Sequence, residues 1–249
     1  MTLGPLIIEH VSKNFGGLQA LTHIDLHIEA GERRVVIGPN GAGKTTLFNV
    51  ISGLIPPSSG KVFIFGKDVT KWPPHKRASL GLGRTFQITN LFPNLTVHEN
   101  LLLSLKAVDT NHRFPLMPLA SYKHLCSRAE GLLNQSGLWE KRNVSVRNLS
   151  YGEQRLVEVI MALAQNPKLV LLDEFTSGLS SVEIITVISV LKSLSRDLTL
   201  LLIEHDMDVA FEVGEFFTVL HMGKVFAEGS LDQIKHNDKV QEIYLGSPQ

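Results

Sequence analysis

A glycine-rich segment at residues 38–45 has the residue types and spacing of a phosphate-binding loop. It reads Gly38-Pro39-Asn40-Gly41-Ala42-Gly43-Lys44-Thr45 and is followed by Thr46. The glycines let successive backbone N–H groups face one ligand, and a helix that begins behind them adds about half a positive charge. Phosphate is the natural ligand of such a loop. Lys44 would reach the β- and γ-phosphates of a nucleotide, and the hydroxyl of Thr45 would coordinate Mg²⁺.

An acidic pair and a histidine follow two apolar runs further along the chain. Asp173 and Glu174 come directly after residues 169–172, and His205 follows residues 200–203 after one intervening residue. Ligands of an open parallel sheet bind outside the carboxyl ends of its strands, so these side chains should converge with the phosphate loop. Asp173 would hold the hydration shell of Mg²⁺, Glu174 would polarise the attacking water, and His205 would hydrogen-bond the γ-phosphate. Each alone could be a solvated strand end.

A second candidate anion site lies at residues 149–155. This segment reads Leu149-Ser150-Tyr151-Gly152-Glu153-Gln154-Arg155. Ser150 and Glu153 have the spacing of a capping box, which predicts a helix that begins here and runs to about Ala164. The start of a helix attracts anions. The residues alone nevertheless favour a structural cap, because capping boxes are common.

Three short apolar runs are expected to form the strands that position these groups. They are residues 35–37, 169–172 and 200–203. Runs that are apolar throughout are typical of strands buried on both faces, as in a parallel sheet covered by helices. A capping box at 180–183 predicts a helix up to about Arg196, so that strand, helix and strand form a right-handed crossover.

Two other parts of the chain have different patterns. Alternation at 23–29 predicts a half-buried strand with His23 and His27 exposed, and residues 61–69 predict a strand pair, which together indicate a peripheral antiparallel sheet. A metal site at the two histidines is disfavoured, because strand residues four apart do not converge on one ion. Residues 88–151 lack a buried-strand pattern and predict a helical insertion.

The insertion is expected to contain two helices. One begins at the capping box 96–99, and the other covers 121–135. Pro115 and Pro118 predict that residues 109–120 form the loop between them.

Composition indicates a globular protein without a long-range electrostatic field. Of 249 residues, 43% are hydrophobic, and 24 Lys and Arg balance 24 Asp and Glu, so nucleic acid is not an expected partner. The apolar runs are shorter than the roughly 18 residues of a membrane-spanning helix. The N-terminus lacks the pattern of a secretory signal, and the one cysteine, Cys126, fits a half-buried helix position better than a catalytic thiol. We therefore expect a cytoplasmic protein.

Four motifs together resemble those of the ATP-binding subunits of ABC transporters. Residues 38–45, 149–155, 169–174 and His205 occur in the order and spacing of that family, over nearly the whole chain. The resemblance implies an α/β fold, a P-loop NTPase (RecA-like) with a parallel-sheet core, a peripheral antiparallel β-subdomain and an inserted α-helical subdomain. It implies one ABC ATPase domain over 1–249, with core and β-subdomain at 1–87 and 155–249, and the helical subdomain at 88–154.

The resemblance also assigns a role to the segment 149–155, which corresponds to the signature loop of the family. It implies that Ser150 and Gly152 contact the γ-phosphate bound to the opposite subunit. Tyr151 and Glu153 belong to the same cofactor-binding segment. Tyr151 is usual in the branch of the family that imports branched-chain amino acids, whereas Glu153 replaces the glutamine that is commoner in the signature loop.

Two further residues acquire roles only through the resemblance. Phe15 stands where the family places an aromatic ring against adenine. Gln87 stands where it places the glutamine that links the metal site to the membrane partner, so Gln87 is both a catalytic and a metal candidate. From the residues alone, Phe15 fits ordinary packing and Gln87 an ordinary polar loop.

Within the family, several segments look most like the ATPase subunits of branched-chain amino acid importers. They are residues 83–87, 91–92, 96–101, 105–123 and 240–246. The implied protein dimerises around two ATP molecules, with Mg²⁺ as cofactor, and powers integral-membrane permease subunits. The second ATPase subunit would be the same chain or a paralogue, and an extracytoplasmic binding protein would take part indirectly. Such a subunit is cytoplasmic and peripheral on the inner face of the cell membrane.

Alternatives remain at this stage. The urea importers are close relatives, and the ATPase of a lipopolysaccharide exporter shares the motif set. A non-transport ABC protein is disfavoured because the chain has no heptads and no second ATPase unit. A P-loop kinase would leave residues 150–155 without a role. The chain departs from the family at Phe175, where relatives usually have proline, and at Ser180, where an aspartate is common.

Overall fold

The computed structural model describes residues 4–85, 91–108 and 121–245 of the chain. These residues divide into two compact units. The first comprises Met1–Arg84, Lys168–Glu174 and Ser195–Gln249, and the second comprises Thr85–Pro167 and Phe175–Leu194. Every described strand lies in the first unit, and the longer helices α3 to α6 lie in the second.

The first unit contains a six-stranded sheet in the order β10-β9-β3-β8-β7-β6. Neighbouring strands are parallel except for the antiparallel pair β9 and β10. The bounds are β3 Arg33–Ile37, β6 Leu82–Arg84, β7 Leu169–Asp173, β8 Thr199–Ile203, β9 Phe216–His221 and β10 Lys224–Ser230. Strands β3, β8 and β7 are buried at every residue. The three strands predicted from the apolar runs are therefore confirmed, and they are adjacent in the sheet.

Helices of the first unit follow the strands of this sheet. Helix α1, Lys44–Ser52, begins directly after the glycine-rich segment that follows β3. Helix α7, Met207–Val213, follows β8, with Asp206 as its N-cap. The shorter helices are α2 Pro74–Ala78, α8 Leu231–Lys235 and α9 Asp238–Leu245. Because β3, β7 and β8 are parallel, their carboxyl ends meet at one edge of the sheet.

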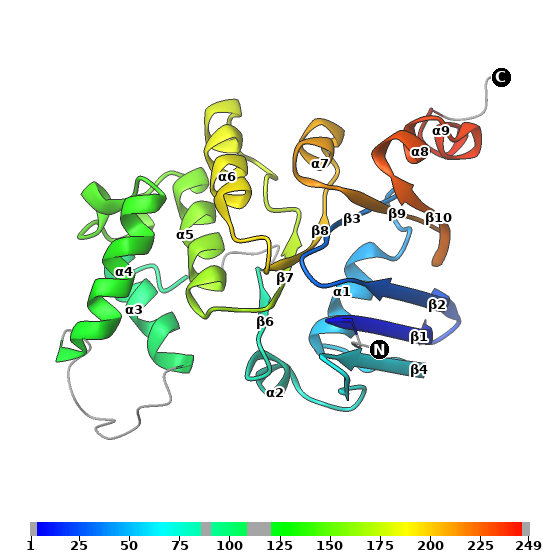
Figure 1. Cartoon of the computed structure of the whole chain (residues 1–249), viewed down its shortest axis with the longest axis horizontal. Helices are drawn as coiled ribbons and strands as arrows, with labels where there is room; N and C mark the ends of the chain where they lie inside the picture. Colours follow the sequence, from blue (N-terminus) through cyan, green and yellow to red (C-terminus); the bar gives the residue numbers. More distant parts are fainter. Residues whose placement is uncertain (1–3, 86–90, 109–120, 246–249) are drawn as a thin grey trace. The chain divides into compact units, whose positions relative to one another are not determined.

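A second, antiparallel sheet in the first unit has the order β2-β1-β4-β5. Figure 1 shows β2, β1 and β4 side by side in this order. Its strands are β1 Leu6–Phe15, β2 Leu18–Ile28, β4 Ser59–Ile64 and β5 Lys67–Asp68. The antiparallel sheet predicted from residues 23–29 and 61–69 is confirmed. Apolar side chains of β1, β2 and β4 pack with Leu47, Phe48 and Ile51 of α1 in one buried cluster. His23 and His27 are exposed, and the described residues contain no cluster of three His, Cys, Asp or Glu side chains suited to a metal.

The second unit is helical. Its elements are α3 Val97–Val108, α4 Lys123–Gln135, η2 Trp139–Lys141, η3 Val146–Asn148, α5 Tyr151–Ala164 and α6 Ser181–Ser193. Helix α3 packs against α4 and α5, and α5 packs against α6. Helix α6 ends at Ser193, before the predicted Arg196, because Leu194 adopts an extended conformation. The predicted loop 109–120 lies outside the described residues.

The division of the chain places α5 and α6 in the helical unit. The subdomain boundary drawn from the sequence, 88–154, stays a prediction. No helix in the described part of the chain has the length and apolar character needed to cross a membrane.

Candidate functional site

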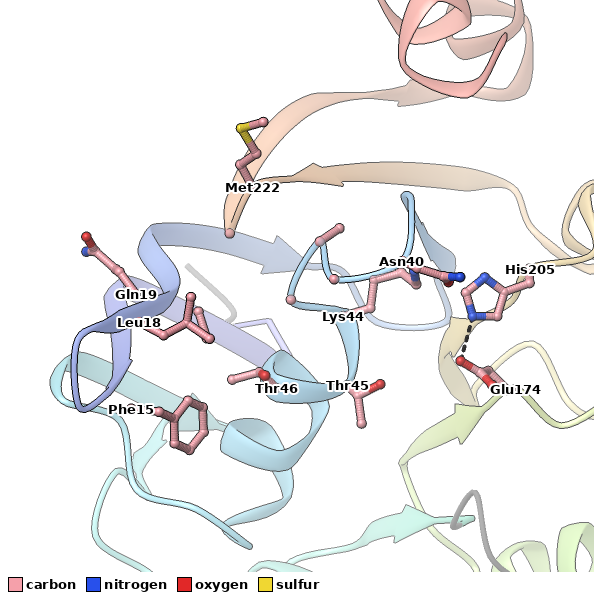
Figure 2. Close-up of a pocket in the computed structure, with 15 residues that line it drawn as sticks. Phe15, Leu18, Gln19, Asn40, Lys44, Thr45, Thr46, Glu174, His205 and Met222 are labelled. Atoms are coloured by element: carbon pink, nitrogen blue, oxygen red, sulfur yellow. Dashed lines mark hydrogen bonds and ion pairs between the residues drawn. The ribbon is translucent and has the colours of Figure 1, made fainter. Parts of the chain in front are cut away.

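A cavity of about 520 Å³ lies in the first unit, at the carboxyl ends of its parallel strands. Figure 2 shows Phe15 and Leu18 toward one end of it, and Glu174 with His205 at the other. The lining residues are Phe15, Leu18, Gln19, Ala20, Asn40, Gly41, Ala42, Gly43, Lys44, Thr45, Thr46, Glu174, His205, Met222 and Gly223. The structure thus brings the glycine-rich loop, Glu174 and His205 to one cavity, whereas Asp173 is fully buried and is not among the lining residues.

The glycine-rich loop has the backbone conformation that its glycines permit. Gly41 and Gly43 have φ values of 78° and 103°, which side-chain-bearing residues rarely adopt. A Cβ on Gly43 would lie 2.7 Å from the carbonyl oxygen of Ala20, whereas one on Gly41 would meet nothing within 4 Å. Gly43 is also the N-cap of α1 and offers no side chain to cap it. The first N–H groups of α1 and the open backbone at Gly41 therefore suit a bound anion.

Lys44 is held by the loop itself. Its side chain is buried, and Nζ donates hydrogen bonds to the carbonyl oxygens of Gly38 at 2.6 Å and Pro39 at 3.0 Å. Burial lowers the pKa of Lys44 below its ordinary value, and the negative charges of Glu174 and Asp173 act in the opposite direction. The ammonium group is therefore positioned at the loop within the electrostatic reach of both carboxylates.

Glu174 and His205 are joined by a hydrogen bond of 2.6 Å between Oε1 and Nε2 (Figure 2). Glu174 has a φ of 45°, in the left-handed region, and its N–H donates to the carbonyl oxygen of Ile203 at 2.9 Å. Strained backbone of this kind clusters at functional sites. Glu174 is thus bonded through its backbone to Ile203, the last residue of β8, and through its carboxylate to His205, two residues beyond the end of β8.

Asp173, the last residue of β7, is fully buried and forms an ion pair with Arg84. Arg84 Nη2 lies 3.3 Å from Asp173 Oδ2. Burial lowers the pKa of Arg84, while the charge of Asp173 and the hydrogen bond to it act to raise it. Reasoning from the sequence did not identify Arg84, because a single arginine before a loop has no local signal of a partner 89 residues away.

Phe15, Asn40, Thr45 and Thr46 are further predicted residues that line the cavity. Phe15 is about half exposed, and Lys13 Nζ lies 5.1 Å from the centre of its ring. Gln87 lies outside the described residues.

The segment 149–155 forms the start of α5 in the second unit. Ser150 is the N-cap, its hydroxyl accepts a hydrogen bond from Glu153 N, and Glu153 Oε2 accepts one from Ser150 N. The predicted capping box is confirmed. Glu153 also forms an ion pair with Lys141. The ring of Tyr151 packs against Gly178, where an added Cβ would lie 2.9 Å from the ring.

An additional carboxylate contacts this segment. The hydroxyl of Ser150 donates to Glu183 Oε1 at 3.0 Å, and a Cβ on Gly152 would overlap the Glu183 carboxyl group. Hydrogen bonds from the backbone and hydroxyl of Ser180 and from the hydroxyl of Ser150 hold the pKa of Glu183 below its ordinary value. In the sequence Glu183 is recognisable only as the partner of Ser180 in the capping box of α6. The start of α5 therefore already has a negatively charged group beside it.

The two positions where the sequence departs from the family that it resembles have structural roles in the second unit. Phe175 is fully buried, and its carbonyl oxygen accepts a hydrogen bond from Arg155 Nε at 3.4 Å. Ser180 is the N-cap of α6 and forms a capping box with Glu183.

Fold and site together define a P-loop NTPase, because a glycine-rich loop joins a buried parallel strand to a helix beside an acidic strand end. Residues 21–177 match the ABC transporter family, and the chain belongs to this family as an ATP-binding cassette with ATPase activity.

Full-length relatives support this assignment. The chain is 35% identical to the probable branched-chain amino acid transport ATP-binding protein LivG of Archaeoglobus fulgidus, over 96% of the chain and 94% of the relative. It is 34% identical to the high-affinity branched-chain amino acid transport ATP-binding protein BraF of Pseudomonas aeruginosa, over 97% of each. The lipopolysaccharide export system ATP-binding protein LptB of Haemophilus influenzae is 32% identical, also over 97% of each.

Solved structures agree with the fold. An ATP-binding cassette of an ABC transporter in its ADP conformation superposes with a TM-score of 0.86 at 30% identity, over 99% of this chain and all of that one. A dimeric bacterial ABC transporter cassette superposes with a TM-score of 0.80 at 30% identity, over 91% and 98%. The predicted fold and family are confirmed.

Proposed function

We propose that this chain is the ATP-hydrolysing subunit of a branched-chain amino acid importer and binds ATP in the cavity of the first unit. The observation that carries the proposal is the convergence of Lys44, Glu174 and His205 on that cavity. The names of the LivG and BraF relatives, at 34–35% identity over nearly the whole chain, support the transported substrate.

The phosphates of ATP would lie against the glycine-rich loop. The N–H groups at the start of α1 have no side-chain cap, and Lys44 Nζ would exchange the carbonyl oxygens of Gly38 and Pro39 for the β- and γ-phosphates. Phe15, exposed toward the far end of the cavity, would stack on the adenine ring. This orientation directs the γ-phosphate toward Glu174 and His205.

The residues present fit Mg²⁺. The Thr45 hydroxyl and the Asp173 carboxylate are hard oxygen ligands of the kind that this ion prefers. Bound Mg²⁺ would neutralise the charge that develops on the transferring phosphoryl group. Gln87 is the further candidate ligand.

Glu174 would accept the proton of the attacking water. A carboxylate only accepts hydrogen bonds, so the N–H of His205 Nε2 donates to Glu174 in the structure. The same N–H is suited to a γ-phosphate oxygen. A transfer of this hydrogen bond to phosphate would release Glu174 Oε1 to polarise water.

The start of α5 would complete the site of a second subunit, which is the same chain or a paralogue. Ser150 and Gly152 would contact the γ-phosphate bound by that subunit, and two such sites would form around a two-fold axis. The dimeric cassette among the structural neighbours supports this arrangement. Closure around two ATP molecules would drive integral-membrane permeases, to which an extracytoplasmic binding protein delivers the amino acid. This chain would lie on the inner face of the cell membrane.

Reconstitution tests the proposal. Proteoliposomes that contain this chain and its permease subunits should take up leucine, isoleucine or valine only with binding protein outside and ATP inside. Omission of this chain should abolish uptake. ATP hydrolysis without uptake of any of the three amino acids would contradict the substrate and leave the ATPase assignment standing.

A further inference from the structure

The buried side chain of Arg84 joins the far end of α1 to the acidic strand end. Arg84 is the last residue of β6. Its Nη1 donates to the carbonyl oxygen of Phe48 at 3.1 Å and to the hydroxyl of Ser52. Its Nη2 donates to Asn49 Oδ1 at 2.8 Å and to Asp173 Oδ2 at 3.3 Å. One planar guanidinium thus binds the last turn of α1 and the carboxylate at the end of β7.

This contact fixes the two oxygen ligands proposed for Mg²⁺ relative to each other. Thr45 lies in the first turn of α1, and the last turn of the same nine-residue helix holds Arg84. A helix of this length is a rigid rod of about 13 Å. A restraint at its last turn therefore sets where the Thr45 hydroxyl lies relative to Asp173.

The ion pair of Arg84 and Asp173 also offsets the free-energy cost of burying the negative charge of Asp173. The side chains of Arg84 and Asp173 are 7% and 1% exposed. A buried carboxylate that loses its cationic partner is strongly disfavoured. Asp173 would then turn toward water, away from the position set by Arg84, and would be a poorer ligand for a cation.

A second arginine binds the same end of α1 through backbone carbonyl oxygens. Arg77 of α2 donates from Nη1 to the carbonyl oxygens of Val50 at 2.8 Å and Ile51 at 2.7 Å. Its other described hydrogen bonds also go to backbone carbonyl oxygens. Burial lowers the pKa of Arg77 to about 10. Arg77 and Arg84 therefore hold the same helix end, but only Arg84 is paired with the acidic strand end.

We propose that Arg84 is a positioning residue for the metal in this site, acting through Asp173 and α1. The inference rests on the proposed binding of a metal–nucleotide complex in the cavity. Arg84 would thus affect the binding of the metal but not the binding of the phosphates. The loop and Lys44 hold the phosphates without help from Arg84, whereas the metal depends on Arg84 for the position of its protein ligands.

The experiment uses the full chain, with Mn²⁺ as the metal and ADP as the nucleotide. Electron paramagnetic resonance gives the Mn²⁺ affinity of the ADP-loaded protein, and calorimetry gives the ADP affinity in EDTA. Arg84→Met should weaken Mn²⁺ binding by about tenfold or more, as changes to residues that hold metal ligands in place do. Its ADP affinity in EDTA should stay at the parent value. Arg84→Lys, which keeps the charge without the planar fork, should give an intermediate Mn²⁺ affinity.

Two controls separate positioning from general damage. Arg77→Met should lower the thermal unfolding temperature but leave the Mn²⁺ affinity unchanged. In an Asp173→Asn background, Arg84→Met should cause a smaller loss of Mn²⁺ affinity than in the parent chain, because the route through the carboxylate is already removed and only the route through α1 remains.

The outcomes distinguish this inference from the proposed function. Equal losses of ADP affinity with and without metal, or additive losses in the double variant, would overturn the role of Arg84. An unchanged Mn²⁺ affinity in folded Arg84→Met protein would do the same. Failure of the parent chain to bind ADP at all would instead contradict the nucleotide site.

Discussion

His205 Nε2 and Glu174 Oε1 lie 2.6 Å apart, so the two groups proposed to act on the γ-phosphate and on water are bonded to each other. Glu174 reaches this position from a strand end with a φ of 45°, and His205 reaches it from the segment between β8 and α7. The hydrogen bond occupies the carboxylate oxygen that hydrolysis needs. Nucleotide binding is thus expected to change the partners of both residues.

Glu174→Gln should separate ATP binding from ATP hydrolysis. The amide has the shape of the carboxyl group and can still pair with His205, but it is a far weaker proton acceptor. We expect hydrolysis to fall by about a hundredfold or more, because general base catalysis contributes at least that much, while ATP affinity persists. Phosphate release and equilibrium binding on the same preparation measure both. Hydrolysis at the parent rate would contradict the assignment of Glu174.

Lys44→Ala should remove nucleotide binding or hydrolysis without loss of the fold. The ammonium group is buried, and burial alone lowers its pKa, so the folded state gains little from the charge. The loop N–H groups remain, but the cation that faces the β- and γ-phosphates is gone. Thermal unfolding should therefore match the parent while ATP affinity drops. Lys13→Ala, which removes a cation from beside Phe15 instead, is the matched control.

Local patterns account for the parts of the fold that the sequence predicts. The runs at 35–37, 169–172 and 200–203 are apolar because both faces of their strands are covered, and this signal survives in the sequence alone. Capping boxes predict the starts of α5 and α6 because both partners lie within one helical turn.

Long-range polar pairs account for what the sequence does not predict. The bond between Arg84 and Asp173 joins residues 89 positions apart, and that between Ser150 and Glu183 joins residues 33 positions apart. Neither residue type nor spacing indicates such partners. The sequence also does not predict the left-handed backbone conformation of Glu174, because the tertiary structure imposes this conformation on a residue type that does not favour it.

Glu183 should make the second unit less stable in acid. Hydrogen bonds from Ser180 and Ser150 hold its pKa below the ordinary 4.5. A carboxylate with a lowered pKa stabilises the fold fully above its unfolded-state pKa and loses this contribution as the pH falls through the folded value. Glu183→Gln should therefore lower the unfolding temperature at pH 7, and the difference from the parent should shrink below about pH 4.5. A difference independent of pH would contradict this account.

Glu183 should also oppose closure of the proposed dimer. Its carboxylate holds the Ser150 hydroxyl that would bind the γ-phosphate of the other subunit, and two negative groups repel at one helix start. Glu183→Gln keeps the capping geometry but removes the charge. In a Glu174→Gln background it should dimerise at lower ATP concentration, as measured by light scattering. Glu99→Gln, at the capping box that begins α3, should have no such effect. A requirement for more ATP after Glu183→Gln would contradict the idea.

A matched pair of substitutions at Ser150 tests the composite site. Ser150 caps α5, so a large residue there would disturb the helix as well as the proposed contact. Asp and Asn are both good N-caps and nearly isosteric, and they differ in charge. In a Glu174→Gln background Ser150→Asn should retain part of the ATP-dependent dimer. Ser150→Asp should abolish it, because a fixed carboxylate would face the γ-phosphate of the partner.

The readout of this pair must distinguish pairing from binding. Size-exclusion chromatography with light scattering at saturating Mg²⁺ and ATP gives the mass, and fluorescence titration gives the ATP affinity. Both variants should keep the ATP affinity of the parent, because the cavity lies in the other unit of the same chain. Added salt tests whether charge repulsion abolishes the dimer of the Ser150→Asp variant, because screening of that repulsion should partly restore the dimer. Equal dimerisation by Asp and Asn variants would mean that no γ-phosphate approaches Ser150. If the Glu174→Gln chain is monomeric even without a change at Ser150, the Asn and Asp variants should be compared in the chain assembled with its permeases. That comparison decides whether Ser150 faces a γ-phosphate, because the assembly holds two copies together at an effective concentration that free subunits lack.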